Sequence, residues 1–220
     1  MKRTIVIALY AALALALVAP LAAQASKADV SYALGMLIGE SAKGTSIDVD
    51  MDALIAGVKD SMGGGKTRFT EAQAGSMVQT AAQAAQDKKG AANLAAGKTF
   101  LEGNKKKAGV KTTASGLQYE VIKEGAGAKP KATDTVTVHY EGKLVSGKVF
   151  DSSIARGEPA TFPLNGVIRG WTEGLQLMGV GAKYRFFIPS DLAYGQQGGG
   201  SIGPNEVLIF EVELISIGKK

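Results

Sequence analysis

The sequence predicts an α+β protein in which a helical N-terminal part precedes an antiparallel β-sheet wrapped around a short helix. Residues 26 to about 109 are rich in Ala, Gln, Lys and Met, whereas residues from about 115 onward are rich in Val, Thr, Gly and aromatic residues. Five of the six prolines lie in the second part, and the sixth is Pro20. Helices followed by strands are typical of two separate units. We expect these units at residues 26–109 and 110–220.

The first 25 residues have the pattern of a secretory signal peptide. Lys2 and Arg3 precede an apolar run from Ile5 to Val18, and Ala23-Gln24-Ala25 has the small-x-small pattern of a cleavage site. The alternative is a retained membrane anchor, which needs about 20 apolar residues, more than this run provides. We therefore expect residues 1–25 to be removed on export.

Composition excludes several classes of functional site. The chain has 25 basic and 20 acidic residues, and loss of the two basic leader residues leaves 23 minus 20, or +3. So small a surplus does not indicate nucleic-acid binding, which needs a concentrated basic face. The absence of cysteine and the single histidine exclude disulfides, thiol nucleophiles and multi-histidine zinc sites.

Two apparent catalytic motifs lack the necessary context. Gly65-Lys66-Thr67 resembles the end of a phosphate-binding loop, but Asp60 stands where that motif needs glycine. Residues 199–203 match the nucleophile elbow G-x-S-x-G, yet the single histidine, His139, lies upstream instead of downstream. His139 is on an alternating segment, and we interpret it as a packed, hydrogen-bonded residue.

Two short amphipathic helices are predicted at the start of the first unit. Asp29 is suited to cap the first helix and Asp50 precedes the second. Their apolar faces, at helical spacing, consist of Val30, Leu34, Leu37 and Ile38, and of Met51, Leu54, Ile55, Val58 and Met62. Helices of this size bury too little surface for a stable monomeric domain. We hypothesise a homodimer through residues 26–68; the alternative is packing on the long helix of the same chain.

A long helix follows. Thr70-Glu71-Ala72-Gln73 predicts a capping box, and the helical pattern extends to Gly109. Large apolar residues are few, and four glycines each cost about 1 kcal/mol relative to alanine: Gly75, Gly90, Gly97 and Gly103. We interpret this helix as an exposed spacer.

The sequence of the second unit predicts five or six antiparallel strands and a short helix. Apolar and polar residues alternate at residues 117–121 and 136–140, and residues 183–189 and 207–217 are further strand-like runs. The short helix starts near Trp171.

An unusual set of aromatic, apolar and acidic residues accompanies these strands. Asp151 follows Phe150 directly, with Arg156 five residues later to pair with it, and Trp171 is flanked by Gly170 and Gly174. A small aromatic core and a functional pocket are equally compatible with the pattern. The set consists of Tyr140, Phe150, Asp151, Phe162, Val167, Ile168, Trp171, Tyr194 and Phe210.

Several long segments resemble those of a known family. They are similar to the signature segments of the FKBP-type peptidyl-prolyl cis-trans isomerases, across about residues 115 to 217: Val138–Leu144, Gly147–Ser153, Val167–Leu175, Ala193–Gly195 and Pro204–Leu214. Ser31–Gly35 and Phe100–Lys107 resemble the N-terminal dimerisation domain of the bacterial Mip-like and FkpA-like members. The resemblance implies an FKBP-like sheet around a short helix, a homodimer, and periplasmic location, with outer-membrane association or secretion as alternatives.

The resemblance also implies functions for individual residues. Trp171 would form the floor of a proline-binding pocket, with Tyr140, Phe150, Phe162, Val167, Ile168 and Phe210 around it. Three residues would act on the substrate: Asp151, which Arg156 would hold in place, Tyr140, and Tyr194 through its hydroxyl at the rim. Ile202 would close the loop side of the pocket. Ala160, where small eukaryotic members carry phenylalanine, and the glycine-rich loop 196–203 imply a shallower or more open pocket.

The implied activity is isomerisation of X-Pro bonds in exported proteins, with a folding-chaperone function. It needs no metal, cofactor or covalent intermediate. The partners would be unfolded or partly folded proline-containing polypeptides, and macrolides are the implied inhibitors. The rival hypothesis is a binding chaperone in which the pocket is incidental.

Overall fold

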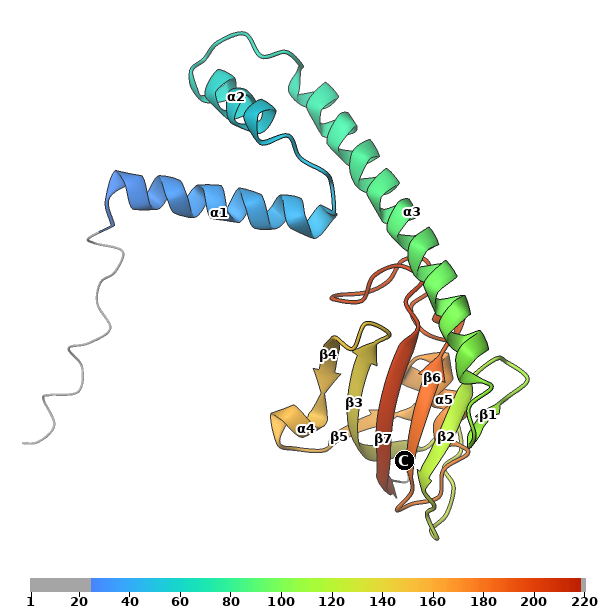
Figure 1. Ribbon diagram of the computed structural model, residues 1–220. Helices are drawn as coiled ribbons and strands as arrows, with labels where there is room; N and C mark the ends of the chain where they lie inside the picture. Colours follow the sequence, from blue (N-terminus) through green and yellow to red (C-terminus); the bar gives the residue numbers. More distant parts are fainter. Residues whose placement is uncertain (1–24, 219–220) are drawn as a thin grey trace, which may run out of the picture. The chain divides into compact units, whose positions relative to one another are not determined.

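The computed structural model describes residues 25–218, which fall into two compact units divided between Arg68 and Phe69 (Figure 1). The expected signal peptide, residues 1–25, lies outside the described residues except for Ala25. Among the helices of residues 25–218, none is both long and apolar enough to cross a membrane.

The first unit contains α1 (Lys27–Thr45) and α2 (Met51–Met62). Ser26, and not Asp29 as expected, is the N-cap of α1: its Oγ accepts from the Asp29 amide, while the Asp29 carboxylate accepts from the Ser26 amide over 3.0 Å. This reciprocal capping box starts the helix two residues before Asp29. Asp50 caps α2, as expected, by accepting from the amides of Asp52 and Ala53.

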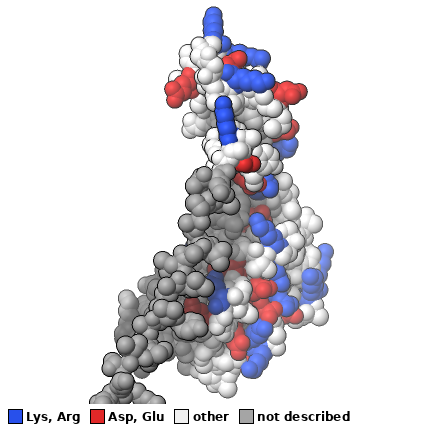
Figure 2. Space-filling model, turned by 90° about the vertical axis from the view of Figure 1, so that its left-hand side faces the viewer, with Lys and Arg blue, Asp and Glu red and all other residues white. Residues whose placement is uncertain are grey.

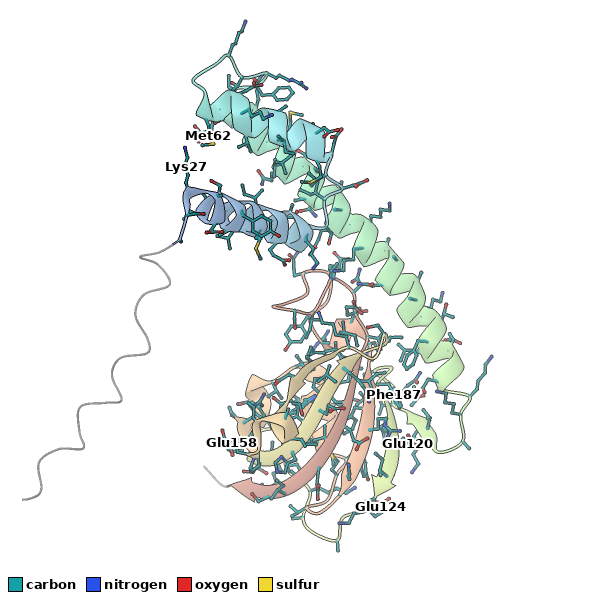
Figure 3. The ribbon with its side chains drawn as sticks, turned by 60° about the vertical axis from the view of Figure 1, so that its left-hand side comes forward. Lys27, Met62, Glu120, Glu124, Glu158 and Phe187 are labelled. Atoms are coloured by element: carbon teal, nitrogen blue, oxygen red, sulfur yellow. The ribbon has the colours of Figure 1, made fainter. Side chains whose placement is uncertain are left out.

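Neither helix of the first unit contains a buried residue. Most large apolar side chains of both helices are exposed, from 38% at Val58 to 83% at Met62, which Figure 3 labels at the end of α2, whereas Leu54 is half-buried. The two helices therefore do not form a buried apolar core within the first unit.

Helix α3 (Glu71–Asn104) begins with the predicted capping box between Thr70 and Gln73 and ends five residues before Gly109. Up to Lys89 it has no buried residue, but Gly90, Gly97 and Asn104 are buried at seven-residue intervals, about two helical turns. The interpretation as an exposed spacer is therefore wrong for the C-terminal part, which packs against the sheet domain within the second unit.

Seven antiparallel strands form one sheet in the order β1-β2-β6-β7-β3-β4, with β5 paired to β3. The predicted alternation is confirmed on β3, where Val136, Val138 and Tyr140 are buried and their neighbours are not. The sheet has more strands than the expected five or six. The strands β1, β4 and β5 contain only three or four residues each, too few to show an alternating pattern in the sequence. The strands are β1 (Val110–Thr112), β2 (Gln118–Lys123), β3 (Thr135–Leu144), β4 (Val149–Ser152), β5 (Ala160–Pro163), β6 (Lys183–Ile188) and β7 (Leu208–Gly218).

Helix α5 (Arg169–Leu175) packs against one face of the sheet (Figure 1), and its glycines explain how closely it approaches. A Cβ at Gly170 would lie 2.4 Å from Cγ2 of Ile188, and one at Gly174 would lie 2.6 Å from Cε1 of Phe186. Both contacts are too short for any side chain, so only glycine lets α5 pack this tightly on β6. Trp171, between the two glycines, is thereby held in the core.

Charged side chains of both signs are mixed on the face of the molecule shown in Figure 2, over the described part of the chain. On the sheet, Arg185 illustrates this mixing: it pairs with Glu120 at 3.0 Å and with Glu211 at 2.9 Å.

Candidate active site

A cavity of about 480 Å³ opens beside α5 and is enclosed by side chains from five elements and two loops. The structure brings every sequence-predicted site residue to this cavity except Arg156, which contacts the lining residues Asp151 and Tyr140. The lining consists of Tyr140, Phe150, Asp151, Phe162, Gly166, Val167, Ile168, Trp171, Tyr194, Ile202 and Phe210. Gly166, in the short helix η2 (Leu164–Gly166), was not anticipated because nothing marks a backbone wall in the sequence.

The aromatic residues contribute both to the core and to the lining of the cavity. Trp171, Tyr140 and Phe210 are 4%, 4% and 5% exposed and belong to the core, yet the same side chains face the cavity. The indole ring centre lies 5.1 Å from that of Tyr140 and 5.1 Å from that of Phe210, with nearly perpendicular planes. Phe162 makes a third edge-to-face contact at 5.8 Å. Such interlocked rings form a rigid apolar floor.

Gly142 on β3 makes room for one wall. A Cβ there would lie 2.6 Å from the Phe210 ring and 2.8 Å from the Phe150 ring. Those two rings meet edge to face, with centres 5.5 Å apart. The glycine was not singled out from the sequence, since a strand glycine reveals no contact until the sheet register is known.

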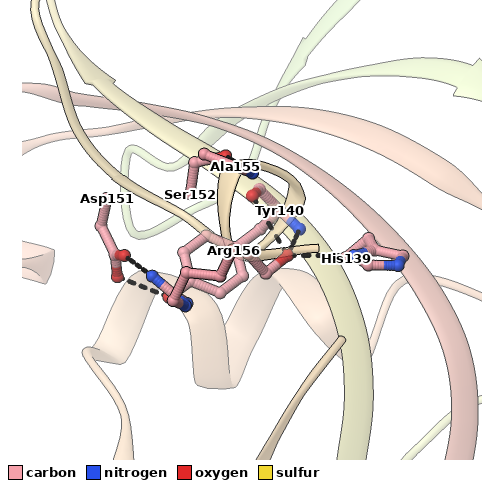
Figure 4. Close-up of polar contacts among 7 residues, drawn as sticks. His139, Tyr140, Asp151, Ser152, Ala155 and Arg156 are labelled. Atoms are coloured by element: carbon pink, nitrogen blue, oxygen red, sulfur yellow. Dashed lines mark hydrogen bonds and ion pairs between the residues drawn. The ribbon is translucent and has the colours of Figure 1, made fainter. Parts of the chain in front are cut away.

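A polar network borders the apolar cavity on one side (Figure 4). The Tyr140 hydroxyl donates to Oδ2 of Asp151 over 2.5 Å, and Nη2 of Arg156 donates to the same hydroxyl over 2.9 Å. Nη1 of Arg156 also forms an ion pair with Asp151, as expected from their spacing. Helix α4 (Ser153–Arg156) presents the guanidinium group; its Ser152 cap accepts from the amide of Ala155.

This network sets the protonation states of its members. Burial raises the pKa of Asp151, but hydrogen bonds from Tyr140 and Arg156 outweigh it and hold the pKa below the ordinary value. Burial, reinforced by the hydrogen bond to Asp151, raises the pKa of Tyr140. The hydrogen bond to Asp151 raises the pKa of Arg156. At neutral pH the wall therefore carries a carboxylate, a phenol and a guanidinium in fixed positions.

Ser153 supports the network from behind. Its side chain is fully buried, and its Oγ accepts from the Tyr140 amide over 2.8 Å. The same oxygen lies 3.1 Å from Nδ1 of His139. His139 is thus hydrogen-bonded, as interpreted, and Ser153 ties α4 to β3. Sequence reasoning missed Ser153, although it lies within the segment Gly147–Ser153.

The loop between η3 (Ser190–Leu192) and β7, which we call the rim loop, contributes Tyr194 and Ile202 to the cavity. Tyr194 is 44% exposed there, whereas Ile202 is 8% exposed and faces the cavity. The amides and carbonyls of Gly199 and Ile202 bond to each other, which folds the loop back on itself. A Cβ at Gly199 would lie 3.1 Å from Cδ1 of Tyr194. The loop therefore packs its backbone against the tyrosine ring.

The site offers shape, apolar surface and fixed charges. Within residues 25–218, no group of three or more His, Asp or Glu side chains is arranged to hold a metal ion. Asp151 is committed to two hydrogen-bond partners, which leaves it poorly suited to accept a proton. The arrangement is suited to bind a compact apolar ring and to orient the polar groups attached to it.

Comparison with known proteins identifies both parts of the chain. Residues 126–215 match the family model of the FKBP-type peptidyl-prolyl cis-trans isomerase, and residues 27–121 match that of the domain amino-terminal to FKBP-type peptidyl-prolyl isomerase. The chain is 48% identical over 202 residues to an FKBP-type isomerase named FkpA from Aeromonas hydrophila, covering 86% of this chain and 75% of the relative. It is 45% identical to the outer membrane protein MIP of Legionella longbeachae, over 88% of this chain and 86% of that protein.

Solved structures agree. The crystal structure of FkpA from Escherichia coli matches with a TM-score of 0.69 and 39% identity, over 88% of this chain and 97% of that one. A peptidyl-prolyl cis-trans isomerase from Pseudomonas syringae matches with a TM-score of 0.55 and 46% identity, over 58% of this chain and 95% of that one.

Proposed function

Because the chain belongs to the FKBP-type peptidyl-prolyl cis-trans isomerases, we propose that the cavity above Trp171 binds the proline of a polypeptide substrate and that the X-Pro bond is isomerised there. The observation that supports this proposal is that one cavity combines an apolar, aromatic floor around Trp171 with a polar wall formed by Tyr140 and Asp151. The floor suits the apolar proline ring, and the wall suits the amide attached to it.

The physical basis is the loss of amide resonance during rotation. The barrier of roughly 18–20 kcal/mol arises because resonance keeps the peptide bond planar. Twisting the bond removes much of the amide dipole, so an apolar cavity disfavours the planar ground state more than the twisted transition state. The perpendicular rings around Trp171 provide such a cavity without rearrangement.

The polar groups of the cavity would act on the substrate by their fixed positions and charges. Asp151 and Tyr140 present a fixed field to the substrate carbonyl, and the half-exposed Tyr194 supplies a hydroxyl donor at the rim. Arg156 keeps the Asp151 carboxylate charged and oriented. Each step of about 1.4 kcal/mol removed from the barrier gives about a tenfold gain in rate. Bond rotation alone completes the reaction, so no proton or nucleophile is transferred.

The test is exchange NMR on a short X-Pro peptide with catalytic amounts of protein. We expect the wild-type chain to broaden or merge the cis and trans signals, and Trp171→Ala, confirmed as folded by circular dichroism, to lose most of this effect. Unchanged exchange rates with the folded variant would contradict the assignment of the cavity.

The same variant separates the isomerase from a pure binding chaperone. We expect Trp171→Ala to slow proline-limited refolding of a client while aggregation suppression changes less. If both activities persist unchanged, the cavity is incidental to client folding.

We infer that the apolar faces of α1 and α2 pair with those of a second copy. The supporting observation is the exposure of Leu34 (58%), Leu37 (68%) and Met51 (60%) in helices without a buried residue. Water-exposed faces of this kind are typical of interaction surfaces. A homodimer would present two isomerase cavities to one client and raise their effective concentration.

We further propose export after cleavage behind Ala25, with the periplasm as the destination. Cleavage there would leave Ser26 as the first residue, and Ser26 is the N-cap of α1, whose capping box needs nothing before it. The name outer membrane protein MIP, carried by one relative, supports an envelope location. Mass spectrometry of the protein purified from the periplasmic fraction tests the proposal, with Ser26 as the expected N-terminal residue. A retained N-terminal Met1 would contradict it.

A further inference from the structure

Helix α3 is bonded to the C-terminal part of the rim loop, which runs from Leu192 to Leu208. Nδ2 of Asn93 donates to the carbonyl oxygen of Pro204 over 2.8 Å, and Nδ2 of Asn205 donates to the carbonyl oxygen of Gly90 over 3.1 Å. These four residues form what we call the α3 clamp. Figure 1 shows this orange-red loop reaching the middle of α3. The two hydrogen bonds attach the loop at Gly90 and Asn93, two points of α3 that lie about one helical turn apart.

Glycine is what permits this approach. A Cβ at Gly90 would lie 3.2 Å from Nδ2 of Asn205 and 3.3 Å from Cβ of Pro204. Two turns later, a Cβ at Gly97 would lie 2.7 Å from Cγ2 of Val207. Helix-interior glycines are unfavourable, yet here they sit at the contact points with the loop. Their placement indicates that close packing of α3 is a built feature of the second unit.

Beyond the clamp, the helix is anchored to the sheet. The Phe100 ring lies 6.0 Å from that of Phe187, labelled in Figure 3, and Asn104 donates to Gln118 over 2.9 Å in a buried contact. The end of α3 is thus held by β2 and β6, independently of the loop. The clamp therefore connects the loop to a part that is itself fixed.

The clamp is linked to both rim residues, Tyr194 and Ile202, through their neighbours in the chain. The amide of Asn205 donates to the carbonyl oxygen of Gly195 over 2.8 Å, next to Tyr194. Ile202 lies two residues before Pro204, and its amide bonds to Gly199. Asn205 itself has a left-handed φ of 55°, which surrounding contacts must maintain. Loss of the clamp would thus release both ends of the rim loop.

We propose that Asn93 and Asn205 are positioning residues that hold Tyr194 and Ile202 over the cavity, so that substrate affinity depends on a helix outside the catalytic sheet. This inference rests on the proposed function of the cavity. Trp171 and the Asp151 network do not contact α3 among the interactions described above, so their geometry is independent of the clamp. The substrate carbonyl to which Tyr194 would donate, and the proline ring that Ile202 would contact, are present both before and during bond rotation. Loosening the rim loop therefore mainly weakens substrate binding, which raises KM and changes kcat little.

The test compares Asn93→Ala with Gln83→Ala in the full chain. Gln83 also donates from α3, to Asp87 over 2.9 Å, but on its exposed N-terminal part. We expect Asn93→Ala to raise KM for an X-Pro peptide about fivefold, the effect of one lost hydrogen bond, with kcat within about twofold of wild type. Gln83→Ala is expected to match the wild type in both constants.

Hydrogen exchange gives a second readout without substrate. We expect the amides of Gly199 and Ile202 to exchange faster in Asn93→Ala and to be unchanged in Gln83→Ala. Unchanged exchange, an unchanged KM, or a loss confined to kcat would each overturn the positioning proposal. A wild-type protein inactive on X-Pro peptides would instead contradict the proposed function, and the exchange experiment would still decide whether the clamp orders the rim.

Discussion

The Tyr140 hydroxyl and the Asp151 carboxylate face each other across neighbouring strands β3 and β4, with their oxygens 2.5 Å apart at the wall of the cavity. Burial and Asp151 raise the pKa of Tyr140, whereas burial of Asp151 is outweighed by the hydrogen bonds from Tyr140 and Arg156, which lower its pKa, so neither group titrates near neutral pH. The wall is therefore a preset electrostatic feature, which suits a reaction that only rotates a bond.

Removing the Tyr140 hydroxyl tests this wall. We expect Tyr140→Phe to fold normally, since its ring stays edge-on to Trp171, and to lower kcat/KM for an X-Pro peptide about tenfold. The matched control is Tyr184→Phe, which loses a hydroxyl contact to Glu124 outside the cavity lining. Exchange NMR measures both variants. Equal activity of the two variants would show that the hydroxyl contributes nothing.

The ion pair between Asp151 and Arg156 should make the stability of the fold depend on pH in the acid range. The pKa of Asp151 is lower in the folded chain than in the unfolded chain, so the folded state binds fewer protons in acid. The contribution is therefore present above about pH 4 and is lost as pH falls through the folded pKa. We expect Asp151→Asn to melt below the wild type at about pH 7 and the gap to shrink towards about pH 3. A gap that stays constant over this range would contradict the assignment.

The packing of α3 can be tested with two glycine substitutions that change helix propensity equally. We expect Gly75→Ala to stabilise the chain by up to about 1 kcal/mol, because nothing lies near the added Cβ. Gly97→Ala should instead destabilise it by about 1–3 kcal/mol through collision with Val207. Urea unfolding monitored by Trp171 fluorescence measures both. Stabilisation by Gly97→Ala would mean that α3 is free of the sheet domain in solution.

The oligomeric state can be tested on α1. We expect Leu34→Glu to convert the protein to a monomer, because it places a charge on the exposed apolar face. Lys43→Glu, nine residues away and so on the opposite side of the helix, should leave the dimer intact. Light scattering gives the mass of each. A wild-type protein that is already monomeric, or a Leu34→Glu dimer, would contradict the pairing of these faces.

Local signals in the sequence were sufficient for the elements that obey periodic rules. Alternation located β3, the motif around Thr70 located the start of α3, and spacing alone suggested the pair of Asp151 and Arg156. Ser26 displaced Asp29 as the cap because a capping box makes both residues plausible until the backbone is known.

The sequence by itself determined the α+β order and, through the family resemblance, the residues that surround the cavity. The tertiary structure alone decided what lies behind them: Ser153 under Tyr140, Gly142 between two rings, and Gly90 against the loop. The reason is physical. Periodicity and motifs record which residue types a segment needs, whereas a small residue or a buried hydroxyl acquires its function only from the partner that folding brings within contact distance.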